Sequence, residues 1–116
     1  MQLSDKGSIL DMDRFGITTQ DRVKTIAEMV RRGYGDQPTL SHDCTCWSDF
    51  FPTGEQYNIA MPDHHYLHIS HDVIPALLEA GVTQTQIDKM FIDTPRRHFE
   101  GVTARFAQRS GSLSHA

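Results

Sequence analysis

The feature that most constrains the fold of this chain is an amphipathic helix pattern set between two short segments with strand character. Between Asp21 and Gly33, four apolar residues recur at i, i+3, i+4 and i+7 on one helix face: Val23, Ile26, Ala27 and Val30. The segment from Ser8 to Asp13, ended by Gly16, precedes this helix, and the segment from Gln37 to Ser41 follows it. This order predicts an α/β fold with a parallel sheet.

Local signals place the helix ends and the second half of the chain. Thr18 or Thr19 is the expected N-cap of the first helix, and Gly33 or Gly35 its C-terminal stop. Residues 44 to 70 are predicted to form a long, ordered, aromatic-rich loop. Three short helices are expected to follow. The first runs from its cap Asp72 to Ala80 and is stopped by Gly81. The second is opened by the capping box of Thr83 and Gln86, with Ile87, Met90 and Phe91 inward, and the third starts at Thr94-Pro95 and contains Phe99.

The domain prediction is one unit over residues 1–100 and a polar, disordered tail over residues 101–116, where few apolar residues remain to be buried. The 116 residues are far fewer than the roughly 250 of an ordinary (β/α)8 barrel. If the chain has a barrel fold, it can therefore form only a fragment of the barrel.

Charge and hydropathy exclude several classes of partner. The net charge is −4, and the eleven Lys and Arg residues are scattered apart from two doublets, so no basic stripe predicts nucleic-acid binding. We find no run of eighteen apolar residues and no apolar stretch after Met1, so neither a membrane span nor a secretory signal is predicted, and a cytoplasmic location is expected. Cys44 and Cys46 are too close for an easy disulfide and are expected to be reduced.

Polar residues that could take part in catalysis or binding follow both predicted strands. Asp43, beside His42, is placed as a metal ligand or general base would be, although an Asp also commonly ends a strand or caps a turn. Arg14 follows the first strand and offers a forked donor set to a substrate oxygen, or else forms a local salt bridge with Asp13. Because the carboxyl ends of parallel strands carry the chemistry in such folds, we expect Asp43 and Arg14 at one site.

A zinc site built from the cysteines and the loop histidines is an alternative. Its ligands would be Cys44, Cys46 and members of the group His64, His65, His68 and His71. The Cys-x-Cys spacing and the histidine spacings fit no common zinc motif, so His65 and His68 are predicted instead to form local hydrogen bonds in the loop.

Four segments in register resemble a known family. They are GSILDMDRFG (residues 7–16), LSHD (residues 40–43), MPDHHYLHISHDVIPAL (residues 61–77) and MFIDTPRR (residues 90–97). Over roughly residues 7 to 100, the chain resembles the C-terminal part of phosphotriesterase-family proteins of the amidohydrolase superfamily, which include phosphotriesterase-related proteins and phosphotriesterase-like lactonases. The resemblance implies strands seven and eight, with their helices, of a (β/α)8 TIM barrel.

The resemblance also implies a function. Family members are hydrolases whose binuclear zinc centre activates a hydroxide that attacks a phosphotriester, lactone or related ester. Asp43 matches the strand-eight aspartate, which ligates a metal and accepts the hydroxide proton. Arg14 matches an arginine that lines the substrate pocket, and Trp47 lies in the loop that selects the substrate. No role in metal binding carries over to His42, Cys44 or Cys46.

Several features of the family are missing from this sequence. The other metal ligands, a His-x-His on strand one, a carboxylated lysine on strand four and histidines on strands five and six, have no counterpart here, and one carboxylate cannot hold zinc. Two residues depart from the family pattern: Pro38, within strand eight, and His64. Because proline cannot donate a strand hydrogen bond, either the strand starts at Thr39 or this copy of the family sequence is degraded. The leading hypothesis is a hydrolase fragment, inactive alone, that requires the N-terminal part of the barrel. The rivals are a small zinc-binding protein and a non-catalytic docking module whose unpaired strands seek a partner.

Overall fold

The computed structural model describes residues 2–45 and 48–101. In chain order the elements are α1 (Gln2–Asp5), β1 (Leu10–Met12), α2 (Thr19–Arg31), β2 (Pro38–Leu40), α3 (Gly54–Ala60), the π-helical turn η1 (Ile69–Val73), α4 (Ile74–Glu79), α5 (Gln84–Asp88) and a second π-helical turn η2 (Lys89–Asp93). Residues 94–101 continue the helix that contains α5 and η2. Of the predicted tail over residues 101–116, Gly101 still belongs to this helix, and residues 102–116 lie outside the described residues.

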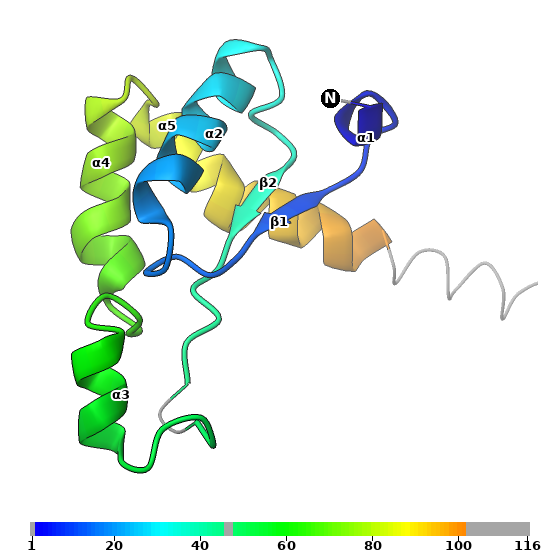
Figure 1. Cartoon of the computed structure of the whole chain (residues 1–116). Coiled ribbons are helices and arrows are strands. Elements are labelled where there is room, and N and C mark those ends of the chain that lie inside the picture. The colour runs from blue at the N-terminus through cyan, green and yellow to red at the C-terminus, as the bar shows by residue number, and fades with distance from the viewer. Residues whose placement is uncertain (1, 46–47, 102–116) are drawn as a thin grey trace, which may run out of the picture.

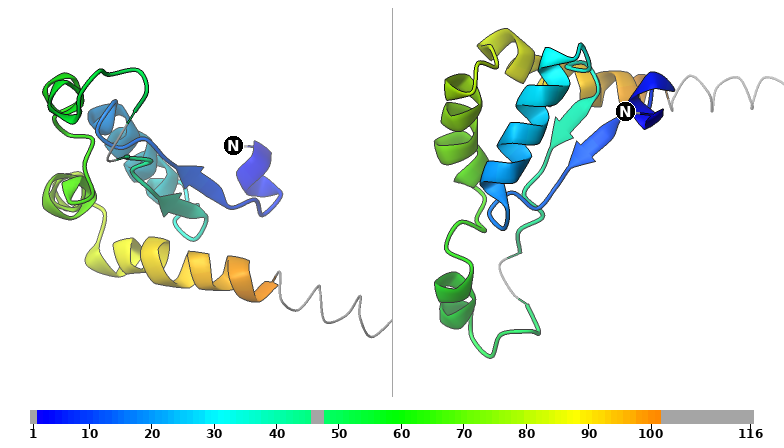
Figure 2. Two further views of the ribbon diagram at one scale, coloured as in Figure 1. Left: turned by 90° about the horizontal axis from the view of Figure 1, so that it is seen from below. Right: turned by 45° about the horizontal axis from the view of Figure 1, so that its top comes forward.

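The predicted parallel strand, helix, strand unit is confirmed. β1 and β2 pair in parallel, with Leu10 opposite Pro38 and Met12 opposite Leu40. Figure 1 shows α2 connecting the two strands with α4 beside it, while the helix that begins with α5 crosses behind the sheet. The further views in Figure 2 show the same arrangement, with that long helix apart from α2 and α4. The β strands are therefore covered on two sides by helices of one chain.

The predicted apolar face of α2 lies in the core, with one addition. Val23 and Ile26 are buried, and Ala27 and Val30 pack at the edge of the same cluster. Met29 is also buried, although the pattern did not include it. The remaining core residues come from the β1–α2 loop, from the later helices and from the connection between α4 and α5: Phe15, Ile69, Val73, Leu77, Val82, Ile87 and Met90. Burial of these apolar side chains is the main force that holds the helices to the sheet.

Pro38 is the first residue of β2, so the alternative in which the strand starts at Thr39 is wrong by one residue. The Leu10 N–H donates to the Gln37 carbonyl at 3.0 Å, and Leu10 pairs with Pro38 in the register. In a parallel ladder this pattern orients the Pro38 nitrogen away from β1, so that no hydrogen bond between the two strands is lost. Its ring is fully buried.

The helix after the long loop begins earlier than predicted. Helical structure starts at His68, and Asp72 lies within η1 instead of capping the helix. The Asp72 carboxylate is engaged by His68, four residues earlier, which removes it from a capping role. The π-helical turn η1 lies just before Pro75, which stands inside a continuous helix. Proline has no N–H to donate to the carbonyl four residues earlier, and the wider π-helical turn is the local change in hydrogen bonding that accompanies it.

Other local predictions divide between confirmed and wrong. The capping box of Thr83 and Gln86 is present in both directions, and Gly81 ends α4 with φ +94°. The predicted loop over residues 44–70 contains a helix, α3, whose N-cap Thr53 accepts a hydrogen bond from the Gln56 N–H. Phe91 and Phe99 are 38% and 68% exposed, so neither is an inward-facing residue within this chain. Among the described residues, no helix has the length and apolarity to cross a bilayer.

Candidate functional site

Two of the three predicted site residues, Arg14 and Asp43, meet where the parallel strands end. Arg14 lies two residues beyond β1 and Asp43 three residues beyond β2. The Arg14 Nε and an Asp43 carboxylate oxygen are 3.6 Å apart. The structure therefore brings together two residues that are 29 positions apart in sequence, as the parallel order predicted. The alternative of an Asp13–Arg14 salt bridge is not what is observed, since Asp13 faces Arg22 at 4.0 Å.

Both residues have an unusual backbone conformation. Arg14 has φ 58° and Asp43 has φ 53°, and they are the two non-glycine residues with positive φ among the described part of the chain. A left-handed conformation costs an L-residue about 1–2 kcal/mol. Such residues gather at functional sites, where the conformation aims a side chain that an ordinary turn would direct elsewhere.

The Arg14–Asp43 pair is open to solvent in this chain. Their side chains are 61% and 59% exposed, so the ion pair is screened by water and contributes little to stability. An exposed pair of this kind leaves both groups accessible to an ion or a substrate. The arrangement presents one carboxylate and one guanidinium, adjacent to each other, at the carboxyl end of the sheet.

A buried histidine fixes the backbone beside Asp43. His64 Nε2 lies 3.0 Å from the carbonyl oxygen of His42, which can only accept, so the Nε2–H donates. Its Nδ1 is then the acceptor of a hydrogen bond that the Tyr57 hydroxyl donates. His64 and Tyr57 are 9% and 4% exposed. The site loop is thus tied to α3, a contact that the sequence analysis did not predict for His64.

The cysteine-based zinc site gains little support from the geometry of Cys44. Its sulfur lies 3.4 Å from His42 Nδ1, and burial raises the pKa of the thiol above its usual value, which disfavours the thiolate that binds zinc. Cys46, the other cysteine of that hypothesis, lies outside the described residues. So does Trp47, whose assignment to the substrate loop stays a prediction.

Asp43 fits a metal only as one ligand of several. Its oxygen atoms suit zinc and are accessible, but protein zinc sites use three or four protein ligands. Around it, among the described residues, the neighbouring partner is the cation Arg14. Asp43 belongs to no group of three or more potential metal ligands in the part of the chain that the structure describes, so a metal held by Asp43 requires further ligands from elsewhere.

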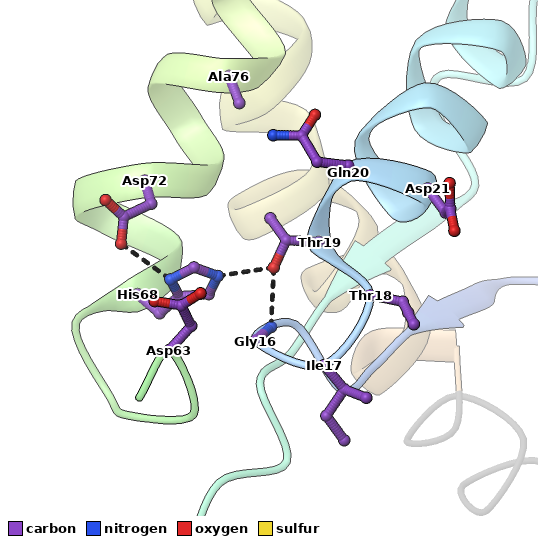
Figure 3. Close-up of a pocket in the computed structure, with 10 residues that line it drawn as sticks. All are labelled: Gly16, Ile17, Thr18, Thr19, Gln20, Asp21, Asp63, His68, Asp72 and Ala76. Carbon is purple, nitrogen blue, oxygen red and sulfur yellow. Dashed lines mark hydrogen bonds and ion pairs between the residues drawn. The ribbon is translucent and has the colours of Figure 1, made fainter. Parts of the chain in front are cut away.

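A second polar cluster, which the sequence analysis missed, lies beside the start of α2. His68 is 2% exposed and contacts Thr19 Oγ1 through Nε2 and Asp72 Oδ2 through Nδ1, each at 2.8 Å. Thr19 Oγ1 also accepts the Gly16 N–H at 3.0 Å. These residues line a cavity of about 520 Å³ between the β1–α2 loop and the α4 helix (Figure 3). The prediction that His68 bonds only within its loop is wrong, because Thr19 is 49 residues away.

Most of this chain is similar in sequence to known proteins. The sequence model of the phosphotriesterase family matches residues 1–99. A phosphotriesterase homology protein of Mycobacterium tuberculosis is 50% identical over 103 residues, which cover 85% of this chain and 31% of that protein. An aryldialkylphosphatase of Saccharolobus solfataricus is 29% identical over 103 residues, covering 84% and 33%, and an N-acetyltaurine hydrolase of Salmo salar is 31% identical over 111 residues, covering 84% and 30%.

Solved structures of related proteins are also similar to this chain. The phosphotriesterase from Mycobacterium tuberculosis superposes with a TM-score of 0.80 at 50% identity, over 85% of this chain and 32% of that one. A mutant organophosphorus hydrolase from Deinococcus radiodurans gives a TM-score of 0.69 at 31% identity, over 80% and 31%. The chain thus spans about a third of the length of the relatives that it matches.

Proposed function

This chain belongs to the phosphotriesterase family and spans about a third of the length of its TIM-barrel relatives, and we propose that it supplies strands seven and eight of a barrel hydrolase. β1 and β2 would be these strands, and α2 and the later helices their outer cover. The proposed reaction is hydrolysis of a phosphotriester, a lactone or a related ester. The observation that carries the proposal is the pairing of Arg14 and Asp43 at the carboxyl ends of parallel strands, where barrel enzymes hold their active sites.

Asp43 has the central role in this proposal. Its accessible carboxylate would be one ligand of a zinc centre and would accept a proton from the attacking water. Zinc, when bound, would supply Lewis-acid activation of water and of the substrate oxygen. The other zinc ligands would come from the rest of the barrel, because one carboxylate is too few.

Arg14 would bind the substrate. Its exposed guanidinium can donate to a phosphoryl or carbonyl oxygen, and its position beside Asp43 would hold that oxygen next to the reacting centre. Trp47 would line the same pocket from the loop after β2. The buried bond from His64 to the His42 carbonyl would keep the Asp43 backbone in place while substrates exchange.

The isolated chain would be inactive in this proposal. The sheet has two strands whose outer edges have no strand partner among the described residues, and such edges favour pairing with further strands. The remaining two thirds of a barrel would provide those strands together with the missing ligands. A cytoplasmic location is part of the same proposal and rests on the sequence alone.

A chimera tests the proposal. Residues 7–100 replace the corresponding segment of the Mycobacterium tuberculosis relative, whose 50% identity favours a compatible fit. With zinc added, the chimera is assayed on an aryl phosphotriester, a lactone and N-acetyltaurine, a panel that spans the chemistry named for the relatives. We expect hydrolysis of at least one substrate by the chimera and none by the isolated chain.

Matched variants of the chimera assign the roles. Asp43→Asn should reduce kcat by roughly a hundredfold or more, as loss of a positioned charge at a reacting centre does. Arg14→Ala should act mainly on KM. Asp36→Asn, an exposed aspartate before β2, is the control and should leave both constants unchanged. Full activity of the Asp43→Asn chimera would refute the assignment.

A further inference from the structure

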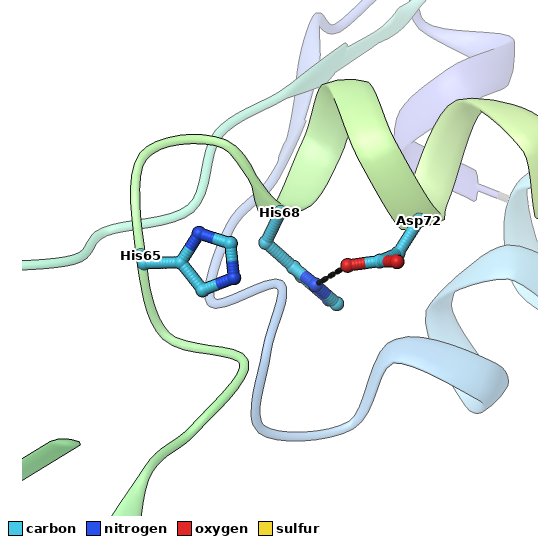
Figure 4. Close-up of side chains that lie close together, drawn as sticks. All are labelled: His65, His68 and Asp72. Carbon is cyan, nitrogen blue, oxygen red and sulfur yellow. Dashed lines mark hydrogen bonds and ion pairs between the residues drawn. The ribbon is translucent and has the colours of Figure 1, made fainter.

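Three side chains with metal-binding chemistry lie together at a place that shares no residue with the Arg14–Asp43 site. One ligand atom each from His65, His68 and Asp72 lies within 4.8 Å of the others (Figure 4). We propose that these residues form a second metal site, which binds a divalent transition-metal ion of the zinc class through two imidazoles and one carboxylate. We call it the helix-start site, because it lies where the helix leading into α4 begins.

The environment of His68 is that of a metal-binding histidine. The ring is almost fully buried, and Nδ1 faces the Asp72 carboxylate while Nε2 contacts Thr19 Oγ1. In metal sites, the ring nitrogen that does not bind the ion is held by a hydrogen bond, which fixes the tautomer and the ring orientation. Thr19 provides this anchor, and it is itself fixed by the Gly16 N–H. The Asp72 carboxylate can only accept, so in the metal-free protein Nδ1–H donates to it. An ion bound to Nδ1 and Asp72 would take the place of this hydrogen, and Nε2–H would then donate to Thr19 Oγ1.

The spacing and exposure of the other two residues suit entry of an ion from solvent. His68 and Asp72 are four residues apart on one helical face, and His65 precedes them by three in the adjoining turn. His65 and Asp72 are exposed, so only the central ligand is buried. Its ring meets the His65 ring edge to face, with centroids 5.8 Å apart.

The charge of the surroundings favours a cation. The cavity next to the helix-start site is lined by three carboxylates, Asp21, Asp63 and Asp72, and its described lining residues include no lysine or arginine. Figure 3 shows the Asp63 and Asp72 side chains among the residues that line this cavity with His68. Negative potential from nearby carboxylates raises the local concentration of cations and stabilises a bound one.

The movement required for binding is small. Zinc bonds of about 2.0–2.1 Å in a tetrahedron place ligand atoms about 3.3 Å apart. The His68 Nδ1 and Asp72 Oδ2 atoms, now 2.8 Å apart, would separate slightly, and the exposed His65 ring would turn toward them. His65 Nδ1 now accepts the Leu67 N–H at 3.2 Å, a bond at the surface that water can replace. Three protein ligands with a fourth position open to water make a complete zinc coordination sphere.

Titration of the whole chain with Zn²⁺ or Co²⁺ tests the helix-start site. Calorimetry gives the stoichiometry and Kd for Zn²⁺, the visible absorption of Co²⁺ reports the coordination number, and imidazole ¹⁵N shifts identify the histidines that bind. We expect one ion per chain, with shifted ring signals from His65 and His68. His65→Ala and Asp72→Asn, at two exposed positions, should each raise Kd by roughly tenfold or more, comparable to the loss found for supporting residues of metal sites.

Two control variants make the outcome decisive. His71→Ala removes an exposed histidine from the same helix and should leave Kd unchanged. Asp43→Asn should also leave it unchanged, which separates this site from the proposed hydrolase centre. The helix-start site is overturned if no stoichiometric binding occurs, if both ligand variants retain Kd within about twofold, or if Asp43→Asn abolishes binding. Failure of the proposed function in the chimera assay leaves these measurements unaffected.

Discussion

Replacement of Gly16 by alanine tests the packing that brings the β1–α2 loop to the start of the α4 helix. Gly16 has φ +105°, and a Cβ atom there would lie 2.5 Å from the Asp63 carbonyl oxygen and 3.0 Å from the His64 Cα. Both atoms belong to backbone, so no flexible side chain can move out of the way. The loop or the turn at Asp63 must shift by almost 1 Å to reach an ordinary contact.

The expected loss of stability has two parts. Positive φ costs an alanine about 1–2 kcal/mol, of which about 0.4–1 kcal/mol is offset because alanine reduces the entropy of the unfolded chain. Forcing the backbone apart adds about 1–3 kcal/mol, the usual cost of overpacking. Gly16→Ala should therefore lower the free energy of unfolding by about 2–4 kcal/mol.

Gly33→Ala is the matched control. Gly33 also has positive φ, +89°, but a Cβ there meets nothing within 4 Å, so only the conformational part applies, about 1 kcal/mol. Urea unfolding followed by circular dichroism measures both variants, and a 2 kcal/mol difference should separate their midpoints by roughly 1 M. If the two variants agree within about 0.5 kcal/mol, the close approach of Gly16 to Asp63 is not as we describe it.

Three further perturbations have defined outcomes. Tyr57→Phe leaves the buried His64 Nδ1 without its donor and should cost about 1–2 kcal/mol in urea unfolding, whereas an unchanged midpoint would contradict the tie to α3. Thr83→Ala removes the capping box of α5 and should cost about 1 kcal/mol, with the exposed Thr85→Ala as the neutral control. Hydrogen bonds from Arg31, in the last turn of α2, and from Arg32, its C-cap, lower the pKa of Glu28 from 4.5 to about 2. The stabilisation from this pairing is therefore complete above pH 4.5 and is lost as the pH falls toward 2. Unfolding midpoints of the wild type and of Glu28→Gln should therefore converge between pH 5 and pH 2.5, and a gap that is constant with pH would disprove the pairing.

Features that depend on residues close together in the chain could be predicted from the amino-acid pattern alone. The 3.6-residue recurrence of Val23 and Ile26 fixed a helix, because burial of one face requires that spacing. The strand, helix, strand order then placed Arg14 and Asp43 at one edge, since parallel strands end on the same side. The capping box at Thr83 and the stop at Gly81 were equally local and equally visible.

Contacts between segments far apart in the chain could not be predicted in this way. His68 gave no periodic or capping signal that pointed to Thr19, 49 residues away, and its burial follows from the packing of α2 beside the α4 helix. The same packing turned Asp72 from an expected cap into the partner of His68, and seated Gly16 against Asp63. A hydrogen bond between two segments depends on where the core places their backbones, and no local pattern of residues encodes that distance.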